Sequence, residues 1–269
     1  MVSLLHMASR SAGRAVLERP RTKTPEKTGV GENKVATIVV SDIHLGSKVS
    51  RVKRLTETIE KEYRVGDRYL FDQLILLGDI FDRLDDMRRL DKDDWEFLEL
   101  IQKISEPEYG VNVVWLHGNH DEASETVVQD FFDTNVLNDY EWRHGNKKFI
   151  ATHGDRFDKF IKRNVRTSKF FSRLYVHIQS IDFKKTRPVS RFFKRLSKKI
   201  YLPKKLQEDI IAYARGKSAD VIFCGHTHHA EAKFSPDGIA YFNTGCWTDI
   251  PSTYVTVSAE GEVATHEVW

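Results

Sequence analysis

Five short segments between residues 42 and 228 carry side chains that can bind metal ions. They offer carboxylates, imidazoles and one amide, without the cysteine pairs of a structural zinc site. That mixture suits divalent manganese, iron, zinc or cobalt in a reactive site better than a structural zinc ion. The segments read Asp42-Ile43-His44, Gly78-Asp79-Ile80-Phe81-Asp82, Gly118-Asn119-His120-Asp121, His153-Gly154-Asp155 and Gly225-His226-Thr227-His228.

Each segment follows an apolar run that is short enough to be one buried strand. The runs cover residues 36–40, 74–77, 113–116, 149–151 and 221–224. Side chains at the strand ends of an open α/β sheet converge on one crevice. Ligands that are remote in the sequence are therefore predicted to meet in a single site.

A pair of divalent ions about 3.5–4 Å apart can clamp a phosphoryl oxygen and activate water at neutral pH. Such a pair needs a bridging carboxylate. Asp79 is the natural choice, because Gly78 before it lets the backbone and a metal ion approach closely. Asn119 adds an amide oxygen and His153 a further imidazole, so the chain holds enough ligands for two ions.

The remaining ligand candidates form two pairs with the same spacing. Asp42 and His44 are two residues apart, and so are His226 and His228. Residues i and i+2 of an extended segment point to the same side. We therefore expect each pair to present both of its side chains to the metal ions.

The elements that must position these residues alternate between strand and helix and end in a β-meander. The spacing of Trp95, Leu98, Ile101 and Ile104 predicts one core-facing stripe on a helix. The pattern indicates an α/β fold with two packed sheets flanked by helices. Strands are predicted at 36–41, 73–77, 111–116, 220–224, 239–243, 252–257 and 262–268, and helices near 51–63, 92–104 and 124–133.

Size and composition favour one α/β domain over residues 35–269, after a flexible N-terminal tail of residues 1–34. No apolar run approaches the roughly 20 residues that cross a bilayer. The two cysteines, Cys224 and Cys246, are too few for a disulfide scaffold, so a reducing compartment is expected. The tail has no signal-peptide core, although a transit peptide or a short interfacial helix remains an alternative for it.

The net charge of +3 conceals a strong asymmetry. Residues 156–217 carry 19 Lys and Arg against 4 Asp and Glu, a balance of +15, whereas the rest of the chain carries −12. Apolar stripes at helical spacing run through this basic block, so it is predicted to be a helical insert that covers the site. Phosphate-rich ligands, nucleic acid and an anionic membrane are the partners that such charge attracts.

The five segments resemble the motifs of calcineurin-like metallophosphoesterases, which run D-x-H, G-D-x-x-D, G-N-H-D/E, H and G-H-x-H. The resemblance spans about residues 36–268 and implies a four-layer α/β/β/α sandwich. It implies one metal ion held by Asp42, His44, Asp79 and His228, and a second held by Asp79, Asn119, His153 and His226. His120 would contact the scissile phosphate or protonate the leaving group, with Asp121 orienting its imidazole. The expected cofactors are two divalent ions, manganese first, with iron, zinc or cobalt as alternatives.

A narrower resemblance is to bacterial UDP-2,3-diacylglucosamine hydrolases and their relatives. It rests on the basic insert and on the segments 153–158, 224–228 and 241–247, with a closing Trp269. Two positions depart from that group, because His120 stands where the hydrolases commonly carry Arg and Cys246 where relatives commonly carry Asp. The resemblance implies a lipid-linked or nucleotide-sugar substrate and a cytoplasmic protein that associates with the inner face of the cytoplasmic membrane.

Three other functions are open to the same site. A nuclease would use the basic surface on nucleic acid, although no dimerisation element is recognisable in the sequence. A protein phosphatase would use the same metals. A non-catalytic binding module belongs to another class, and in that case we expect the ligands or His120 to have degenerated, whereas all of them are present.

Overall fold

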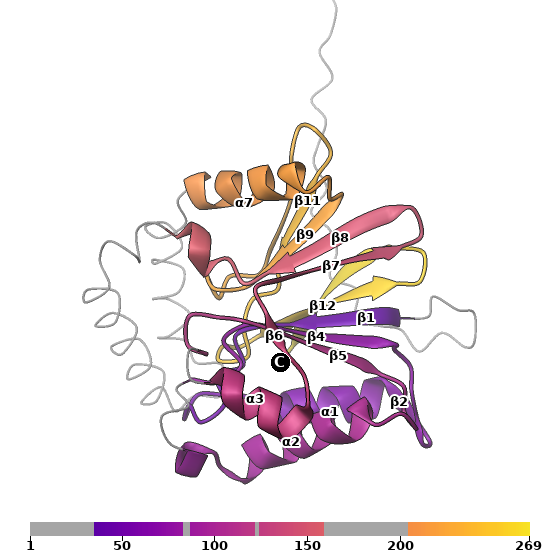
Figure 1. Ribbon diagram of the computed structural model, residues 1–269, viewed down its shortest axis with the longest axis vertical. Helices are drawn as coiled ribbons and strands as arrows, with labels where there is room; N and C mark the ends of the chain where they lie inside the picture. Colours follow the sequence, from indigo (N-terminus) through magenta and orange to yellow (C-terminus); the bar gives the residue numbers. More distant parts are fainter. Residues whose placement is uncertain (1–34, 83–86, 122–123, 159–203) are drawn as a thin grey trace, which may run out of the picture. The chain divides into compact units, whose positions relative to one another are not determined.

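The computed structural model describes residues 35–82, 87–121, 124–158 and 204–269, which belong to one compact unit, Glu32–Trp269. Two β-sheets lie face to face in this unit, and helices cover the outer face of each sheet (Figure 1). The layers run helix, sheet, sheet, helix, which confirms the predicted α/β/β/α sandwich. The tail of residues 1–34 lies outside the described residues.

The first sheet has six strands in the order β13-β12-β1-β4-β5-β6. Within it β1, β4, β5 and β6 run parallel, and β12 runs antiparallel to β1. Parallel strands bring their carboxyl ends to the same edge, which places three of the predicted segments side by side. The strands are β1 (Val35–Val40), β4 (Gln73–Leu77), β5 (Asn112–Leu116), β6 (Val136–Leu137), β12 (Ser252–Ser258) and β13 (Val263–Val268).

The second sheet has five strands in the order β10-β11-β9-β8-β7. The central strands β8, β9 and β11 are parallel, so β8 and β9 also end at one edge. A separate hairpin joins β2 (Arg64–Val65) and β3 (Arg68–Tyr69). The strands of the second sheet are β7 (Asp139–His144), β8 (Lys147–Thr152), β9 (Val221–Cys224), β10 (Glu231–Phe234) and β11 (Ala240–Asn243).

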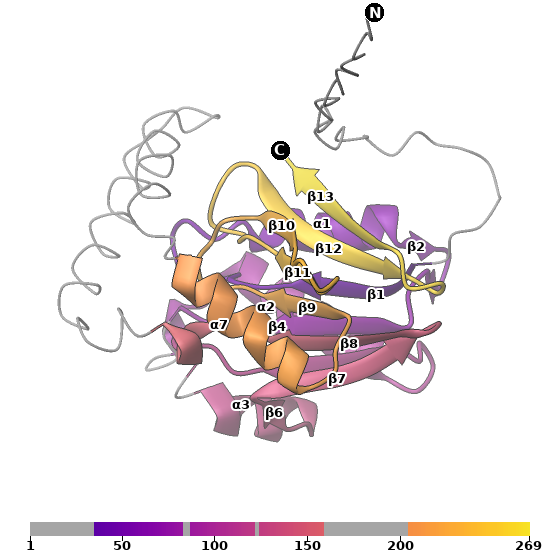
Figure 2. The same ribbon diagram turned by 90° about the horizontal axis from the view of Figure 1, so that it is seen from above.

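Helices α1 (Val52–Glu62), α2 (Lys92–Ser105) and α3 (Ser124–Phe132) lie on the outer side of the first sheet, and α7 (Lys204–Gly216) crosses the second sheet (Figures 1 and 2). Short 3-10 turns, η1 (Met87–Arg89) and η2 (Asp155–Phe157), precede α2 and follow β8. A capping box starts α2, because Asp91 accepts from the Asp94 amide and Asp94 accepts from the Asp91 amide.

The strand period of two divides the apolar residues among three cores. On β4, Leu74 and Leu76 face the helices of the first sheet, whereas Ile75 and Leu77 face the second sheet. On β9, Phe223 faces the first sheet and Ile222 faces α7. Each large side chain buried in this way contributes roughly 1.5–3 kcal/mol. Both faces of these strands are buried, which explains why they appear in the sequence as continuous apolar runs.

One predicted stripe is wrong in part. Trp95 is 36% exposed, while Phe97, Ile101 and Ile104 are fully buried on α2. A spacing of three residues drifts around a helix of 3.6 residues per turn, and the buried stripe follows the i, i+4, i+7 pattern instead.

The last part of the predicted helical insert forms α7, which packs on the second sheet through Leu206, Ile210 and Ala214. It is therefore a layer of the body, although it falls inside the range 156–217 that the sequence assigned to the insert. The rest of that insert, residues 159–203, lies outside the described residues. Within the described ranges, no helix is both long and apolar enough to span a membrane.

Candidate metal centre

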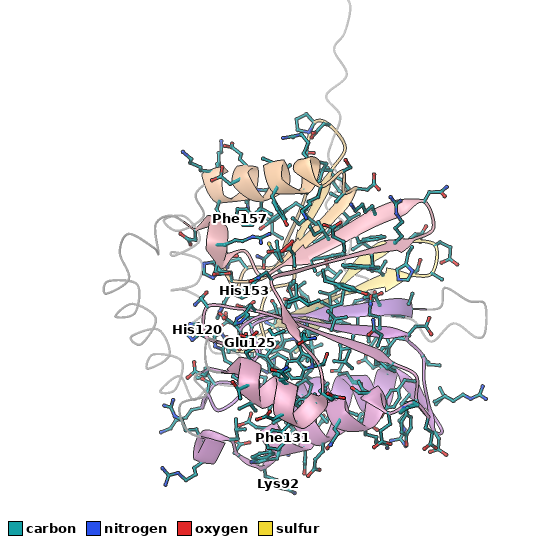
Figure 3. The ribbon with its side chains drawn as sticks, viewed as in Figure 1. Lys92, His120, Glu125, Phe131, His153 and Phe157 are labelled. Atoms are coloured by element: carbon teal, nitrogen blue, oxygen red, sulfur yellow. The ribbon has the colours of Figure 1, made fainter. Side chains whose placement is uncertain are left out.

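The predicted ligands lie at one end of the sandwich, in the turns that follow β1, β4, β5, β8 and β9. Figure 3 shows His120 and His153 at this end, between the two sheets. The first sheet positions Asp42, His44 and Asp79, and the second sheet positions the imidazoles that face them. The structure thus brings together residues that are up to 186 positions apart in the sequence.

One group consists of Asp42, His44, Asp79 and His228, each of which offers a ligand atom within 4.8 Å of the others. The Nε2 atom of His228 lies 3.1 Å from Oδ1 of Asp42 and 3.2 Å from Nε2 of His44. Nε2 of His44 is 4.0 Å from Oδ2 of Asp79. This group contains the four ligands that the family resemblance implies for one ion.

A second group consists of Asp79, His153 and His226. The Nε2 atom of His153 lies 3.3 Å from Oδ2 of Asp79, so Asp79 belongs to both groups. Asn119, the fourth ligand expected here, follows β5 in the adjacent loop, and its side chain is exposed and lines a neighbouring cavity.

The ring of His153 is held in one orientation. Its Nδ1 atom lies 3.0 Å from the carbonyl oxygen of Leu77, and because a carbonyl only accepts, Nδ1 must be the protonated nitrogen. Nε2 of His153 and Nδ1 of His44 are both buried and form no hydrogen bond of good geometry within the described part of the chain, although carboxylate oxygens of Asp79 and Asp82 lie 3.3 and 3.4 Å from them. Buried imidazole nitrogens without partners, beside carboxylates, fit the ligand atoms of a metal site.

The ligand turns adopt a backbone conformation that the sequence did not indicate. Asp42, His44, Asp79, His226 and His228 have φ angles between 51° and 66°, in the left-handed region. The expectation that both ligand pairs lie in extended segments is therefore wrong. Left-handed residues other than glycine cost free energy, and they cluster at functional sites where the surrounding structure enforces them.

Glycines make room for these ligand turns. A Cβ atom on Gly118 would overlap the carboxylate of Asp79, and one on Gly225 would overlap the carboxylate of Asp42. A Cβ atom on Gly78 would collide with the ring of His153. The glycines of three motifs are therefore required by close packing around the ligands.

His120 is oriented by Asp82 rather than by Asp121. The Nδ1 atom of His120 lies 2.9 Å from the backbone carbonyl oxygen of Asp82. The Asp82 carboxylate also reaches Nδ1 of His44 at 3.4 Å, so one residue contacts both imidazoles. His120 is half-buried and its backbone N–H donates to Oδ1 of Asp79, which ties it to the metal groups.

Asp121 joins two of the ligand loops. Its carboxylate accepts hydrogen bonds from the backbone N–H groups of Gly118 at 3.1 Å and Phe81 at 3.0 Å. Burial, together with the charge of Asp79, raises the pKa of Asp121 to about 6. These contacts correct the expectation from the resemblance, because they bind the turn after β5 to the turn after β4 and give Asp121 a structural part.

The sequence reasoning assigned no particular imidazole to two residues that lie beside the ligands. Asp158 is buried and its Oδ2 atom lies 3.3 Å from Nε2 of His226. On the other side, Cys246 lies beside His228, and its thiol is 3.7 Å from Oδ2 of Asp249. Both residues stood in quoted motifs, but only the fold shows which imidazole each one contacts.

Carboxylates and imidazoles hold one another in their charged forms. Burial pushes the pKa of Asp79 up, but His153, His120 and His44 together outweigh burial, and the pKa lies well below its ordinary value. Burial likewise pushes the pKa of His153 down, but Asp79 and Asp42 raise it to about 10. Asp79 is therefore ionised at neutral pH, and metal binding must displace a proton from His153.

The donor set fits a pair of divalent ions. Asp42, His44, Asp79, His153 and His228 form a candidate binuclear site in which Asp79 is common to both positions. Oxygen and imidazole donors with no cysteine in either group match first-row divalent ions.

Comparison with known proteins gives one family match and several distant structural likenesses. A family model described as calcineurin-like phosphoesterase matches residues 36–230. No curated protein matches the chain significantly.

Among solved structures, Vps29 from Cryptosporidium parvum is 13% identical with a TM-score of 0.46, and the match covers 86% of this chain and 96% of that one. Yfce, a phosphoesterase from E. coli, is 16% identical with a TM-score of 0.44, and the match covers 87% and 99% of the two chains.

Proposed function

The chain belongs to the calcineurin-like phosphoesterase family, and we propose that it hydrolyses a phosphodiester or diphosphate bond with two divalent metal ions. The observation that carries the proposal is the position of Asp79, which is common to both groups of metal-binding side chains. A shared carboxylate is what a site for two adjacent ions requires.

In this proposal the first ion is held by Asp42, His44, Asp79 and His228, and the second by Asp79, Asn119, His153 and His226. When bound, such ions neutralise charge on phosphoryl oxygens and acidify water. The protein keeps the ligands ready, because its carboxylates are already ionised and its imidazole rings are fixed by outer contacts.

His120 is proposed to donate a proton to the leaving oxygen. Its Nδ1 atom is engaged with the Asp82 carbonyl, which leaves Nε2 as the nitrogen that can reach substrate. The ring is half-buried and partly open to solvent, as a group that meets a substrate must be.

The substrate is proposed to be lipid-linked or a nucleotide sugar, such as UDP-2,3-diacylglucosamine, with manganese as the metal. Support comes from the sequence, in the segments 153–158, 224–228 and 241–247 and in the balance of +15 over residues 156–217. An anionic membrane surface is the proposed partner of that basic block, because it attracts clustered Lys and Arg.

A parallel assay of the manganese-loaded protein tests the proposal. The substrates are UDP-2,3-diacylglucosamine, a simple phosphodiester and single-stranded DNA. We expect turnover of the first two and the highest kcat/KM on the lipid-linked substrate. Highest activity on DNA would replace the lipid proposal by a nuclease, and no turnover of any substrate with two ions bound would favour a non-catalytic module.

A further inference from the structure

A cavity of about 260 Å³ opens beside the metal centre. It is formed by the loop after β5, the connection between β6 and β7, the end of β8 and the turn η2. The cavity adjoins the second metal group, because its walls include Thr152, next to His153 in the chain, and Asn119, the fourth ligand expected for that group. A group esterified to a phosphate at the metal centre can therefore extend into it. The lining side chains include His117, Asn119, Asn138, Thr152, Asp155 and Arg156.

Four polar side chains face this cavity with hydrogen-bonding capacity to spare. Asn119, Asn138, Thr152 and Asp155 form no side-chain hydrogen bond with any residue in the described ranges. Thr152 is the most telling of them, because the residue is only 1% exposed. The residue nevertheless lines the cavity, and its hydroxyl has no hydrogen-bond partner among the described residues. Buried polar groups are normally satisfied, and here a ligand or water must supply the partners.

The charges of the cavity wall argue against a second anion. Arg156 is the cation of the wall, but its guanidinium already pairs with Asp139 at 3.0 Å. The carboxylate of Asp155 has no hydrogen bond to any described residue. Nε2 of His117 lies 3.6 Å from Oε2 of Glu125, so this imidazole already faces a carboxylate. Within the described wall, Arg156 and Asp139 compensate each other, and the carboxylate of Asp155 would repel a further phosphate.

The composition of the wall also argues against a nucleobase or an acyl chain. None of the described lining residues is Phe, Tyr or Trp, the large aromatic side chains that serve as stacking platforms for bases. The amides, hydroxyl and carboxylate offer both donors and acceptors, as recognition of several hydroxyl groups requires. The volume lies just below the usual range of about 300–1,000 Å³ for drug-sized ligands, so the occupant is one small group.

We propose that this cavity binds a neutral polyhydroxyl group, a sugar or a glycerol unit, that is esterified to the phosphate at the metal centre. Asp155 accepts from hydroxyl groups, Asn138 both donates and accepts, and Thr152 bonds the innermost hydroxyl. Asn119 donates through its amide nitrogen, because its oxygen is assigned to the second metal ion. The inference rests on the proposed phosphoesterase function and names the substrate class that the site prefers.

The test uses phosphodiesters that share one leaving group and differ in one ester arm. Each carries 4-nitrophenol, and the arms are methyl, glycerol, glucose through O6, choline and thymidine through O5′. We expect kcat/KM on the glycerol or glucose arm to exceed that on the methyl arm by at least about 10-fold, since two or more neutral hydrogen bonds are gained. The glycerol and glucose esters separate the two sources of a polyol.

Variants of the wall locate the preference. Thr152→Val replaces a hydroxyl by a methyl group of similar size, and Asn138→Ala removes an exposed amide. Both variants should therefore fold, and their melting temperatures check this. Each is expected to lower the ratio of polyol-ester to methyl-ester kcat/KM by about 3- to 10-fold. Asn112→Ala is the matched control, because Asn112 is an exposed asparagine at the start of β5, and it should leave the ratio unchanged.

The outcomes separate the two proposals. Three results would overturn the cavity assignment and leave the phosphoesterase activity intact. They are equal turnover of methyl and polyol esters, a preference for the choline or thymidine ester, and a polyol-to-methyl ratio that the wall variants do not change. If no ester is hydrolysed, the proposed function fails, and saturation-transfer NMR with glucose 6-phosphate still decides the cavity. Signals from the ring protons that vanish in Thr152→Val/Asn138→Ala support it, and their absence in the wild type overturns it.

Discussion

The two sheets of the sandwich contribute unlike halves of the metal centre. The first sheet supplies Asp42 and Asp79, the carboxylates of both groups, together with His44. The second sheet supplies only imidazoles to those groups, from His153, His226 and His228 in the turns after β8 and β9. Each of these two groups draws on both sheets, whereas a third cluster of possible ligands, His44, Asp82 and His120, comes from the turns of the first sheet alone.

This division shows that the metal centre depends on the core between the sheets. Leu77 ends β4 in that core, and its carbonyl oxygen fixes the ring of His153 from the other sheet. Across the same gap, Oδ2 of Asp42 accepts a hydrogen bond of 3.1 Å from the backbone N–H of His226. The opposite charges of the two halves are therefore held together by apolar packing and by direct hydrogen bonds.

Removing the shared carboxylate should have the largest effect. Asp79→Ala takes a ligand from both groups, so we expect turnover to fall by more than the roughly 100-fold that losing one outer partner costs. Elemental analysis should show that bound metal falls in parallel. Two ions bound per chain in an active Asp79→Ala variant would contradict the assignment of Asp79.

The two residues that follow Asn119 should behave differently from each other. His120→Ala is expected to lower kcat by roughly 10²- to 10⁴-fold with both metals retained, as for loss of a general acid. Asp121→Asn should mainly lower the melting temperature, because Asp121 ties Gly118 to Phe81. Loss of metal from His120→Ala as complete as from Asp79→Ala would make His120 a ligand.

Metal removal tests whether ions hold the two sheets together. Chelation should lower the free energy of unfolding by about 2.7 kcal/mol for each site that had been loaded at 100 times its dissociation constant. Calorimetry with manganese and with chelator measures this difference. Asp79→Ala is the matched control, and a shift of equal size in that variant would mean that metal stabilises the protein elsewhere.

The contacts behind the second-sheet imidazoles should have the smallest effects. Asp158→Asn and Cys246→Ala are each expected to weaken metal binding by about 10- to 100-fold, with Asp158 the larger because a carboxylate is the stronger acceptor. Calorimetric titration with manganese measures both.

The other buried cysteine provides the control. Cys224→Ala should leave metal affinity nearly unchanged, because its side chain faces α7 and bonds the hydroxyl of Tyr241. Equal losses in Cys224→Ala and Cys246→Ala would show that the effect is general loosening rather than orientation of His228.

Most of the elements and the ligand types could be predicted from the sequence. Apolar runs of strand length marked β1, β4, β5 and β9, because strands buried on both faces leave continuous hydrophobic segments. The hairpin of β7 and β8 was recognised only at residues 149–151, because β7 alternates polar and aromatic residues and lies at the sheet edge. Local sequence patterns therefore predict well which strands are buried, and predict poorly which strands pair with one another.

By itself, the sequence determined which carboxylates and imidazoles are available as metal ligands, because donor chemistry belongs to the side chains and their order to the chain. Only the tertiary structure decided how they are presented. Three features depend on segments that meet through packing. They are the left-handed turns at Asp42 and Asp79, the contact of His120 with Asp82, and the contact of His228 with Cys246. Such contacts between distant segments leave no periodicity in the sequence, because they arise from the arrangement of the layers.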